Sequence, residues 1–303
     1  MARPNFHRHG LAALTASLRR SVLPLCMVLI GLLPSLAVAA APAATQRVVA
    51  LGGDITETVY ALGAGSVLVG VDSTSQWPQQ AHQLPDVGYV RQLNAEGVLA
   101  LRPQLIIATH DAGPPPVIAQ LHDAGVRMEL LPVSRTPADV VAKVREIGRL
   151  LGRDAQAEQL AAGIERNYAA LAASVAAMRA HPRVVFLMST GAGSPKAAGR
   201  DTAADSAIAL AGGRNAADGY SGYKPVSAEA LVALAPEVIV LMHERSDGVG
   251  DVGSVLAMPG VAQTPAGKAR RIVFADGQAL LGFGPRSAAQ AQSLQRNLAT
   301  AVP

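Results

Sequence analysis

Two stretches of the chain repeat one pattern: "LNAEGVLALRPQLIIATHD" (Leu93–Asp111) and "VSAEALVALAPEVIVLMHE" (Val226–Glu244), at a constant offset of 133 residues. Each has an Ala-Glu pair at a helix start, a short apolar helix, a proline, and an all-apolar run that ends in histidine and an acid. Apolar runs of this length, alternating with short helices, are typical of buried parallel strands. The repeat therefore predicts an α/β fold with two similar lobes, each built on a central sheet.

A shorter pair of matching segments supports the division into two lobes. "RVVAL" (Arg47–Leu51) and "RVVFL" (Arg183–Leu187) lie ahead of the two copies and predict the first strand of each lobe. A third pair is looser: "DITETVYAL" (Asp54–Leu62) resembles "TAADSAIAL" (Thr202–Leu210). Three matching segments in the same order indicate that the second half of the chain is built like the first.

A long helical region separates the two copies. Thr136 suits an N-cap and Pro137 a first helical turn. Apolar residues then recur at helical spacing from Val140 to Leu151 and, after a glycine, from Ala157 to Met178. The pattern predicts one long backbone helix joining the lobes. The predicted division is a leader at 1–39, an N-terminal lobe at 40–136, a helical region at 137–181 and a C-terminal lobe at 182–303.

The first 39 residues have the layout of a cleaved secretory signal peptide. Four arginines precede an uncharged apolar run, Val22–Val38, and Ala37-Val38-Ala39 gives a small-x-small cleavage pattern. A membrane anchor is the alternative, but 17 residues that include two prolines are marginal for spanning a bilayer. We expect export to the periplasm.

Removing this leader changes the composition. It holds the only cysteine, Cys26, so the mature chain has no disulfide or thiolate chemistry. It also holds four of the 26 Lys and Arg residues and none of the 22 acidic ones, so the net charge of +4 comes from the leader. Without a basic stripe or an aromatic platform, nucleic acid is excluded as a partner. No nucleophile elbow, phosphate loop or His-Glu-x-x-His motif is present, so we expect a binding protein rather than an enzyme.

Five segments carry a resemblance to a known family: "GGDITETVYALGA" (Gly52–Ala64), "VGYVRQLNAEGVLALRPQLII" (Val87–Ile107), "KAAGRDTAADSAIALAGGRNAADGY" (Lys196–Tyr220), "YKPVSAEALVALAPEVI" (Tyr223–Ile239) and "LGFGPR" (Leu281–Arg286). With them the chain resembles the substrate-binding proteins of ABC importers of the metal-chelate class, which carry haem, cobalamin and siderophores. The first and fourth segments are shared across that class. The Gly-Tyr-x-Arg-x-Leu-x-Ala-Glu-Gly pattern in the second is more specific to the haem binders.

The resemblance implies a role for Tyr89 and Arg91. In the family, the tyrosine at the position of Tyr89 is the axial ligand of haem iron, and the arginine at Arg91 hydrogen-bonds its phenolic oxygen. Phenolate is a hard anionic donor suited to ferric iron, and both iron and a guanidinium favour the phenolate form. The alternative, from spacing alone, is that Tyr89 covers the edge of the core while Arg91 is solvated.

Haem carries two propionates, which favour cationic partners. The candidates are Lys196, Arg200 and Arg286, and each of them also fits a solvated surface charge. Tyr220 and Tyr223 are candidates to stack on the porphyrin, and the alternative is that they only close the turn. His110 and His243 are metal-capable, but the repeat itself explains their positions. The segment Leu187–Lys196 contains no histidine, which disfavours a second stacked haem.

The wider class uses one acid on each lobe to pair with arginines of the membrane permease. The resemblance places Glu57 and Asp205 at these positions, since the looser repeat puts one opposite the other. The alternative is that each acid only stabilises the first turn of its helix.

The sequence thus predicts a monomeric periplasmic protein that captures haem b, as ferric haem, between its lobes and delivers it to an inner-membrane ABC importer, its permease and cytoplasmic ATPase, for iron acquisition. Binding of cobalamin or a ferric siderophore is the alternative within the class. A tetrapyrrole chelatase-like enzyme, with His110 and Asp111 on the metal, is a further alternative that export disfavours. The pair of Tyr89 and Arg91 favours haem over these alternatives, because only haem binding gives both residues a common role.

Overall fold

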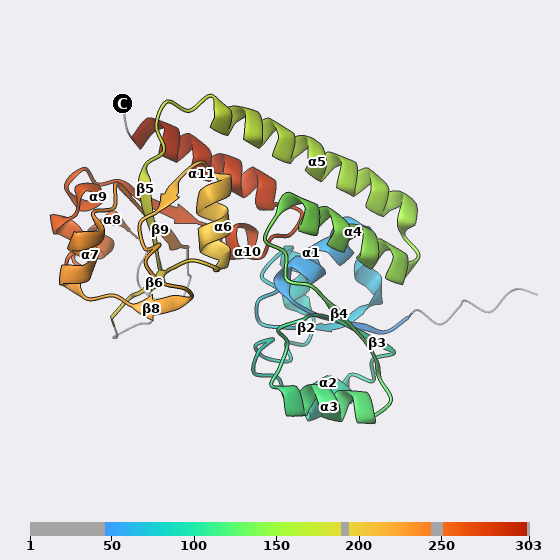
Figure 1. Cartoon of the computed structure of the whole chain (residues 1–303). Helices are drawn as coiled ribbons and strands as arrows, with labels where there is room; N and C mark the ends of the chain where they lie inside the picture. Colours follow the sequence, from blue (N-terminus) through green and yellow to red (C-terminus); the bar gives the residue numbers. More distant parts are fainter. Residues whose placement is uncertain (1–45, 189–193, 244–250, 302–303) are drawn as a thin grey trace, which may run out of the picture. The chain divides into compact units, whose positions relative to one another are not determined.

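A computed structural model describes residues 46–188, 194–243 and 251–301. The predicted leader lies outside these residues, as does part of the segment from 187 to 196. Two separate sheets organise the described chain, one formed by residues before the long helical region and one by residues after it (Figure 1). The predicted pair of α/β lobes is therefore confirmed.

The N-terminal sheet contains four parallel strands in the order β2-β1-β3-β4. Their bounds are β1 Val48–Leu51, β2 Leu68–Val71, β3 Leu105–Thr109 and β4 Arg127–Leu131. The helices α1 (Gly53–Ala61), α2 (Ala95–Ala100) and α3 (Pro115–Asp123), with the short 3-10 turns Gly65–Val67 and Gln79–Gln83, connect them. Because all four strands are parallel, their carboxyl ends meet at one edge, where ligands of open α/β sheets gather.

The C-terminal sheet is larger and mixed. Parallel strands β10, β9 and β5 continue into antiparallel β6 and β8, and β7 pairs with β5. The strands are β5 Arg183–Met188, β6 Lys196–Ala198, β7 Arg214–Asn215, β8 Tyr223–Pro225, β9 Val238–Met242 and β10 Ile272–Ala275. The helices of this lobe are α6 Ala203–Leu210, α7 Ala228–Leu234, α8 Val252–Leu256, α9 Pro265–Lys268, α10 Gly277–Leu281 and α11 Ser287–Ala301, with a 3-10 turn at Val261–Gln263. The antiparallel extension is the main departure from the N-terminal lobe.

The repeated segments fold alike. Asn94 and Ser227 accept backbone N–H groups at the starts of α2 and α7, and each helix is followed by a buried strand, β3 or β9. The two "RVV" segments form β1 and β5. Within these strands alternate residues enter different hydrophobic clusters: Val48 belongs to one and Val49 to another. Both faces of each sheet are covered, as expected of parallel strands.

Two consecutive helices join the lobes. In α4 (Pro137–Leu151), Thr136 and Asp139 form a capping box, and Gly152, in the left-handed conformation, ends the helix. The next helix, α5 (Asp154–Ala176), is 23 residues long and is the predicted backbone helix. It packs against α4 and α11 (Figure 1). Among the described residues, no helix combines the length and apolar character needed to cross a membrane.

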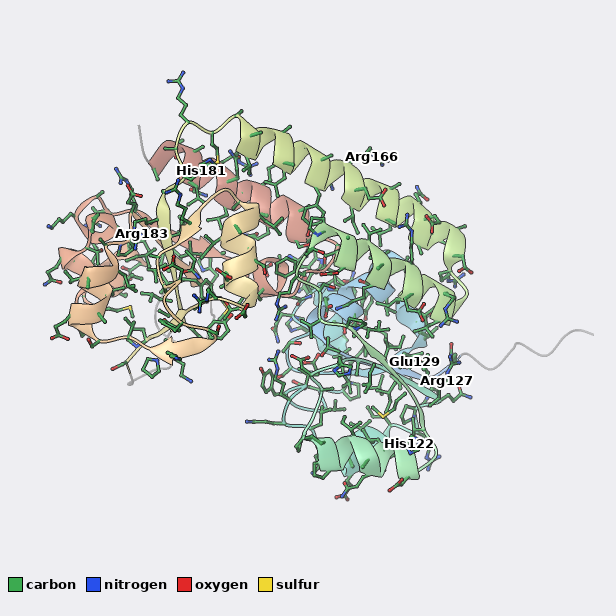
Figure 2. The ribbon with its side chains drawn as sticks, in the orientation of Figure 1. His122, Arg127, Glu129, Arg166, His181 and Arg183 are labelled. Carbon is green, nitrogen blue, oxygen red and sulfur yellow. The ribbon has the colours of Figure 1, made fainter. Side chains whose placement is uncertain are left out.

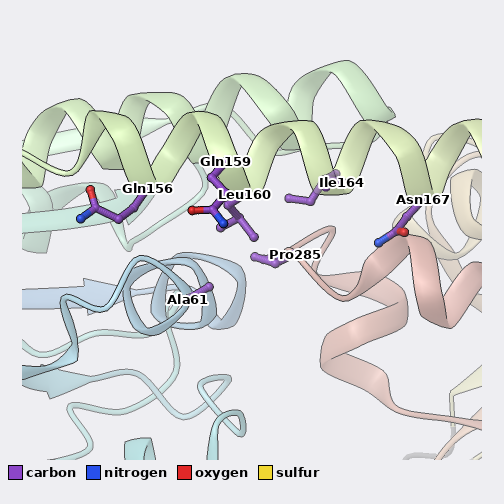
Figure 3. A pocket seen from close by; sticks show the side chains of 8 residues that line it. Ala61, Gln156, Gln159, Leu160, Ile164, Asn167 and Pro285 are labelled. Carbon is purple, nitrogen blue, oxygen red and sulfur yellow. The ribbon is translucent and has the colours of Figure 1, made fainter.

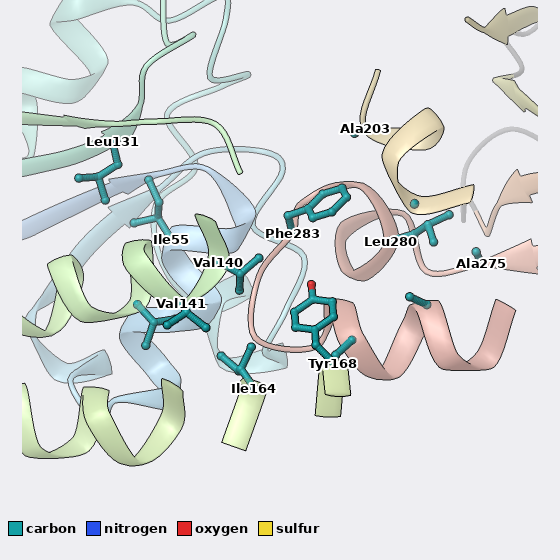
Figure 4. Close-up of a cluster of buried hydrophobic side chains, with 14 of the residues drawn as sticks. Ile55, Leu131, Val140, Val141, Ile164, Tyr168, Ala203, Ala275, Leu280 and Phe283 are labelled. Atoms are coloured by element: carbon teal, nitrogen blue, oxygen red, sulfur yellow. The ribbon is translucent and has the colours of Figure 1, made fainter. Parts of the chain in front are cut away.

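The largest hydrophobic cluster contains residues of both lobes and of the helices between them. Val140 of α4, Tyr168 of α5 and Phe283 of the C-terminal lobe belong to it (Figure 4). The Tyr168 hydroxyl also hydrogen-bonds the hydroxyl of Ser287 at 2.7 Å. A Cβ added at Gly284 would lie 3.2 Å from the Asp54 Cα, so this glycine of the "LGFGPR" segment allows the two lobes to approach closely. Residues 44–303 accordingly form one compact unit.

Candidate functional site

Tyr89 lies on a loop at the carboxyl edge of the N-terminal sheet. The segment that leads to it runs beside the end of β2, where Val87 N–H donates to Val71 O at 2.9 Å and Ser73 N–H to Gly88 O at 3.0 Å. Gly88 has φ 92°, a conformation that favours glycine, and it turns the chain toward Tyr89. Tyr89 therefore stands on a loop held beside the end of β2.

Alternation of side chains fixes this loop. Val90 and Leu93 are buried in the cluster below the sheet, whereas Tyr89 is 38% exposed and Arg91 is also exposed. Backbone hydrogen bonds join the loop to the segment after β3: Gly113 N–H donates to Val90 O at 2.9 Å and Leu93 N–H to Gly113 O at 2.8 Å. The two buried residues anchor the loop, so the phenol is presented outward on a fixed backbone.

Arg91 connects Tyr89 to an acid. Its Nη1 donates to the Tyr89 hydroxyl, and its Nε donates to the Asp111 Oδ2 at 2.8 Å. Nη2 donates to the same carboxylate oxygen. Partial burial alone would raise the pKa of Asp111, but hydrogen bonding and the charge of Arg91 outweigh burial and lower it. The predicted contact between Arg91 and the phenolic oxygen is thus present, and Asp111 is an additional member of the cluster.

Tyr223 belongs to β8 of the C-terminal lobe and is half-buried. Burial raises the pKa of Tyr223, and hydrogen bonds with the Ala204 backbone and the Thr202 side chain, followed by the charges of Arg135 and Arg91, oppose this rise. Arg135, which follows β4, is half-buried and forms no ion pair with any described carboxylate. Sequence reasoning missed Arg135, because it stands outside the segments that carry the resemblance.

Lys196 and Arg200 lie on and just after β6, and both are exposed. Neither forms an ion pair with a described acid. The antiparallel strand β6 stands between β5 and α6, so these two residues lie at a sheet edge and not on a simple strand-to-helix loop. Both remain available to an anionic ligand.

Arg286 contacts two acids and a tryptophan ring. Its Nη1 donates to Asp276 Oδ2 at 2.7 Å, its Nε lies 3.1 Å from Glu57 Oε2, and its guanidinium carbon lies 4.6 Å from the centre of the Trp77 ring. The remaining Nη2 is buried without a partner among the described residues. With its charge balanced by two acids, Arg286 does not present a free cation to a propionate, contrary to the prediction.

Glu57 is the buried partner in that cluster. It is 4% exposed, and its Oε1 accepts the backbone N–H of Arg286 at 2.8 Å. The structure therefore does not favour the predicted docking role of Glu57, since the carboxylate is buried against Arg286. Asp205 is half-buried and accepts from Asn215 Nδ2 at 2.9 Å. It also lies in the first turn of α6, where its own N–H donates to Thr202, so the stabilisation of the helix accounts for it.

The acids that are exposed at repeated positions are Glu96 and Glu229. Each is the second residue of its helix, in α2 and α7, and each lies in the Ala-Glu pair of the 133-residue repeat. The signal was in the sequence, since the strict repeat pairs these two glutamates, whereas Glu57 and Asp205 are paired only by the looser one.

Two other features of the described chain are separate from this loop. A pocket of about 410 Å³ lies along α5, and its lining includes the neutral amides Gln156, Gln159 and Asn167 together with Leu160 and Ile164 (Figure 3). None of the residues around Tyr89 lines it. His110 and His243 are exposed after β3 and β9, as the repeat predicts. Within the described ranges, no three His, Cys, Asp or Glu residues converge as a metal site.

The profile of the periplasmic binding protein family matches residues 48–279. The chain belongs to this family. A vitamin B12-binding protein of Yersinia pseudotuberculosis serotype O:1b is 30% identical over 225 residues, 74% of this chain and 78% of that protein. An uncharacterized ABC transporter substrate-binding lipoprotein of Bacillus subtilis, YvrC, is 26% identical over 244 residues, 80% of this chain and 76% of that protein.

Among solved structures of the same fold, the periplasmic heme-binding protein RhuT from Roseiflexus sp. RS-1, in apo form, has a TM-score of 0.81 and 39% identity, covering 86% of this chain and 100% of RhuT. A periplasmic heme-binding protein from Pseudomonas aeruginosa has a TM-score of 0.77 and 40% identity, covering 84% and 92%. The heme-binding protein BhuT, in complex with two hemes, has a TM-score of 0.80 and 39% identity, covering 85% and 99%.

Proposed function

We propose that this protein binds haem through Tyr89 and delivers it to an ABC importer. The observation that carries the proposal is the exposed Tyr89 phenol, fixed on its loop and contacted at its oxygen by Arg91. A phenolic oxygen suits ferric iron, and tyrosine is an established haem ligand. The solved heme-binding structures at 39–40% identity support this assignment.

Three cations outside the described ion pairs suit the rest of the ligand. We assign Lys196, Arg200 and Arg135 to the propionates, because none of them is paired with a described carboxylate. Guanidinium groups bind carboxylates through two parallel hydrogen bonds, and an ammonium binds them as a point charge. Tyr223, on β8 of the C-terminal lobe, is assigned to the opposite wall of the site.

Cobalamin is the second candidate, because the vitamin B12-binding relatives are 28–32% identical to the chain over the matched residues. Cobalamin brings its own axial ligands and gains nothing from a phenolate held by an arginine. The Tyr89 and Arg91 pair therefore favours haem. The proposed role is capture and transport in the periplasm by a monomer, after removal of residues 1–39, with lobes at 40–136 and 182–303 joined by the helical region 137–181.

The test is a titration of the purified mature protein with ferric haem, followed by absorption spectroscopy, beside parallel titrations with cobalamin and a ferric siderophore. We expect saturable haem binding with a phenolate-to-iron charge-transfer band at roughly 600 nm. Tyr89→Phe, which removes only the oxygen, is expected to abolish the band and weaken binding at least about 100-fold. Tyr220→Phe is the matched control, because the Tyr220 hydroxyl donates to the backbone oxygen of Ala197 and should leave the band unchanged.

Diffuse haem binding that is insensitive to Tyr89→Phe, with saturable binding of cobalamin or the siderophore, would overturn the proposal. The end point of the same titration counts the haems. We expect one per chain, because the segment Leu187–Lys196 has no histidine to hold a second. An end point of two equivalents would match the complex of BhuT instead.

Delivery requires recognition by the permease. We propose that Glu96 and Glu229, one exposed acid on each lobe, make the contacts with permease arginines. Two exposed ion pairs of up to about 1 kcal/mol each correspond to about a tenfold change. The double variant Glu96→Gln/Glu229→Gln should therefore slow haem uptake by liposomes containing the importer about tenfold, without changing haem affinity. Asp205→Asn is the control, and a larger loss with it than with the double variant would reject this assignment.

A further inference from the structure

The Arg91 guanidinium is held by a carboxylate that lies twenty residues further along the chain. Nε and Nη2 of Arg91 both donate to Oδ2 of Asp111, the first at 2.8 Å. Only Nη1 is directed to the Tyr89 hydroxyl. The side with two donors is thus occupied by the acid, and the remaining arm reaches the phenol.

This arrangement determines where Nη1 can point. The guanidinium is planar, so two donors on one oxygen fix its rotation about the end of the side chain. Arg91 has a 51% exposed side chain and would otherwise sample many rotamers in water. The carboxylate that restrains it is itself fixed, because the segments carrying Asp111 and Arg91 are joined through Gly113 and Val90.

We propose that Asp111 is a positioning residue for the haem ligand: it orients Arg91 on the Tyr89 oxygen. This inference rests on the proposed function, since it describes how the same tyrosine is prepared for iron. Asp111 acts through Arg91 and makes no contact with the haem itself. Without the acid, Arg91 would spend less time donating to the oxygen that binds iron.

An ordinary surface ion pair would contribute little, so a matched pair is needed for comparison. Arg127 and Glu129, on β4 of the same lobe, have the same clamp: Nε and Nη2 donate to Glu129 Oε1 at 3.0 and 2.7 Å (Figure 2). The exposed fractions are similar, 56% and 31% against 51% and 33%. Neither Arg127 nor Glu129 contacts an aromatic hydroxyl among the described residues, so Glu129→Ala reports the effect of losing such a clamp elsewhere.

The experiment measures ferric haem affinity and the position of the charge-transfer band in six forms of the mature protein. They are the wild type, Asp111→Ala, Asp111→Asn, Arg91→Ala, Arg91→Ala/Asp111→Ala and Glu129→Ala. Loss of a residue that supports a metal ligand weakens binding about 10- to 100-fold. We expect Asp111→Ala to bind haem about tenfold more weakly than wild type, with its band displaced in the same direction as that of Arg91→Ala. Glu129→Ala should change affinity by less than about twofold.

Two comparisons separate positioning from other roles. In the Arg91→Ala background, adding Asp111→Ala is expected to have no further effect, because the acid acts only through the arginine. Asp111→Asn keeps an acceptor oxygen and should bind haem more tightly than Asp111→Ala. Any of three results would overturn the inference. Asp111→Ala could bind haem as tightly as wild type, Asp111→Ala could weaken haem binding further in the Arg91→Ala background, or Asp111→Asn could bind haem no more tightly than Asp111→Ala.

The two proposals fail in distinguishable ways. If wild type shows no charge-transfer band, or if Tyr89→Phe keeps it, the haem assignment fails and the role of Asp111 fails with it. If wild type binds haem through Tyr89 and the six affinities do not follow the expected order, only the role of Asp111 fails.

Discussion

Arg91 and Arg286 are each held between an acid and an aromatic ring, but their surroundings differ. Arg91 lies at the edge of one lobe, with its guanidinium carbon 5.6 Å from the Tyr89 ring centre, and its side chain is 51% exposed. Arg286 lies 4.6 Å from the Trp77 ring centre, is 28% exposed, and reaches the buried Glu57. One arginine leaves a phenol open to solvent, whereas the other fills a contact between lobes.

The contacts of Arg286 connect parts of the chain that are far apart in sequence. Glu57 belongs to α1 and Arg286 to the turn before α11, and Gln278 also donates to Gly53 O at 2.8 Å across the same contact. A second buried pair, Lys143 and Asp54 at 2.6 Å, joins α4 to α1 nearby. The difference between the two arginines teaches that the same residue type is left available to a ligand where its partner is exposed and stabilises the fold where its partner is buried.

The largest effect expected from this difference is on stability. Arg286→Ala leaves Glu57 buried without its cation, and breaking a buried pair in this way costs about 3–5 kcal/mol. We expect urea denaturation of the mature protein to show a loss of about 3 kcal/mol in the free energy of unfolding, while the folded variant keeps the charge-transfer band of bound haem.

Arg91→Ala is the matched counterpart. Its exposed ion pair should contribute no more than about 1 kcal/mol to the free energy of unfolding, so this variant should lose haem affinity instead. The distinction between the two arginines would be wrong if Arg286→Ala is as stable as wild type, or if the folded variant loses the charge-transfer band of bound haem. Either result would show that Arg286 belongs to the ligand site after all.

Much of the fold could be predicted because its signals are local. The apolar runs of β3 and β9 and the caps Asn94, Ser227 and Thr136 lie next to the elements that they define. The antiparallel pair of β6 and β8 could not be predicted in this way, because it is three residues per strand and depends on pairing across more than twenty residues.

The site was predictable in part for the same reason. Tyr89 and Arg91 are two residues apart, and their contact follows from the loop that carries both. Asp111 and Arg135 reach the neighbourhood only through the fold. Glu57 shows this limit most clearly. An acid near the start of a helix has the same sequence pattern whether it faces solvent or, as here, an arginine 229 residues away.

The smallest expected effect concerns the protonation of Glu57. Burial raises the pKa of Glu57 above its ordinary 4.5, and the charge and hydrogen bonds of Arg286 oppose the rise without cancelling it. The folded protein therefore holds this proton to a higher pH than the unfolded chain does. The contribution of Glu57 to stability is fully present below 4.5 and is lost as the pH rises through its folded-state pKa.

Glu57→Gln removes this titration while keeping the shape of the side chain. We expect the stability of wild type relative to Glu57→Gln to fall as the pH rises above 4.5 and then to level off. Urea denaturation at intervals from about pH 4 to 8 measures this difference, with Glu96→Gln as an exposed control. A difference that instead grows with pH would mean that Arg286 outweighs burial. The ion pair between Glu57 and Arg286 would then stabilise the contact between the lobes. Arg286 and Arg91 would differ only in how much their ion pairs contribute to stability.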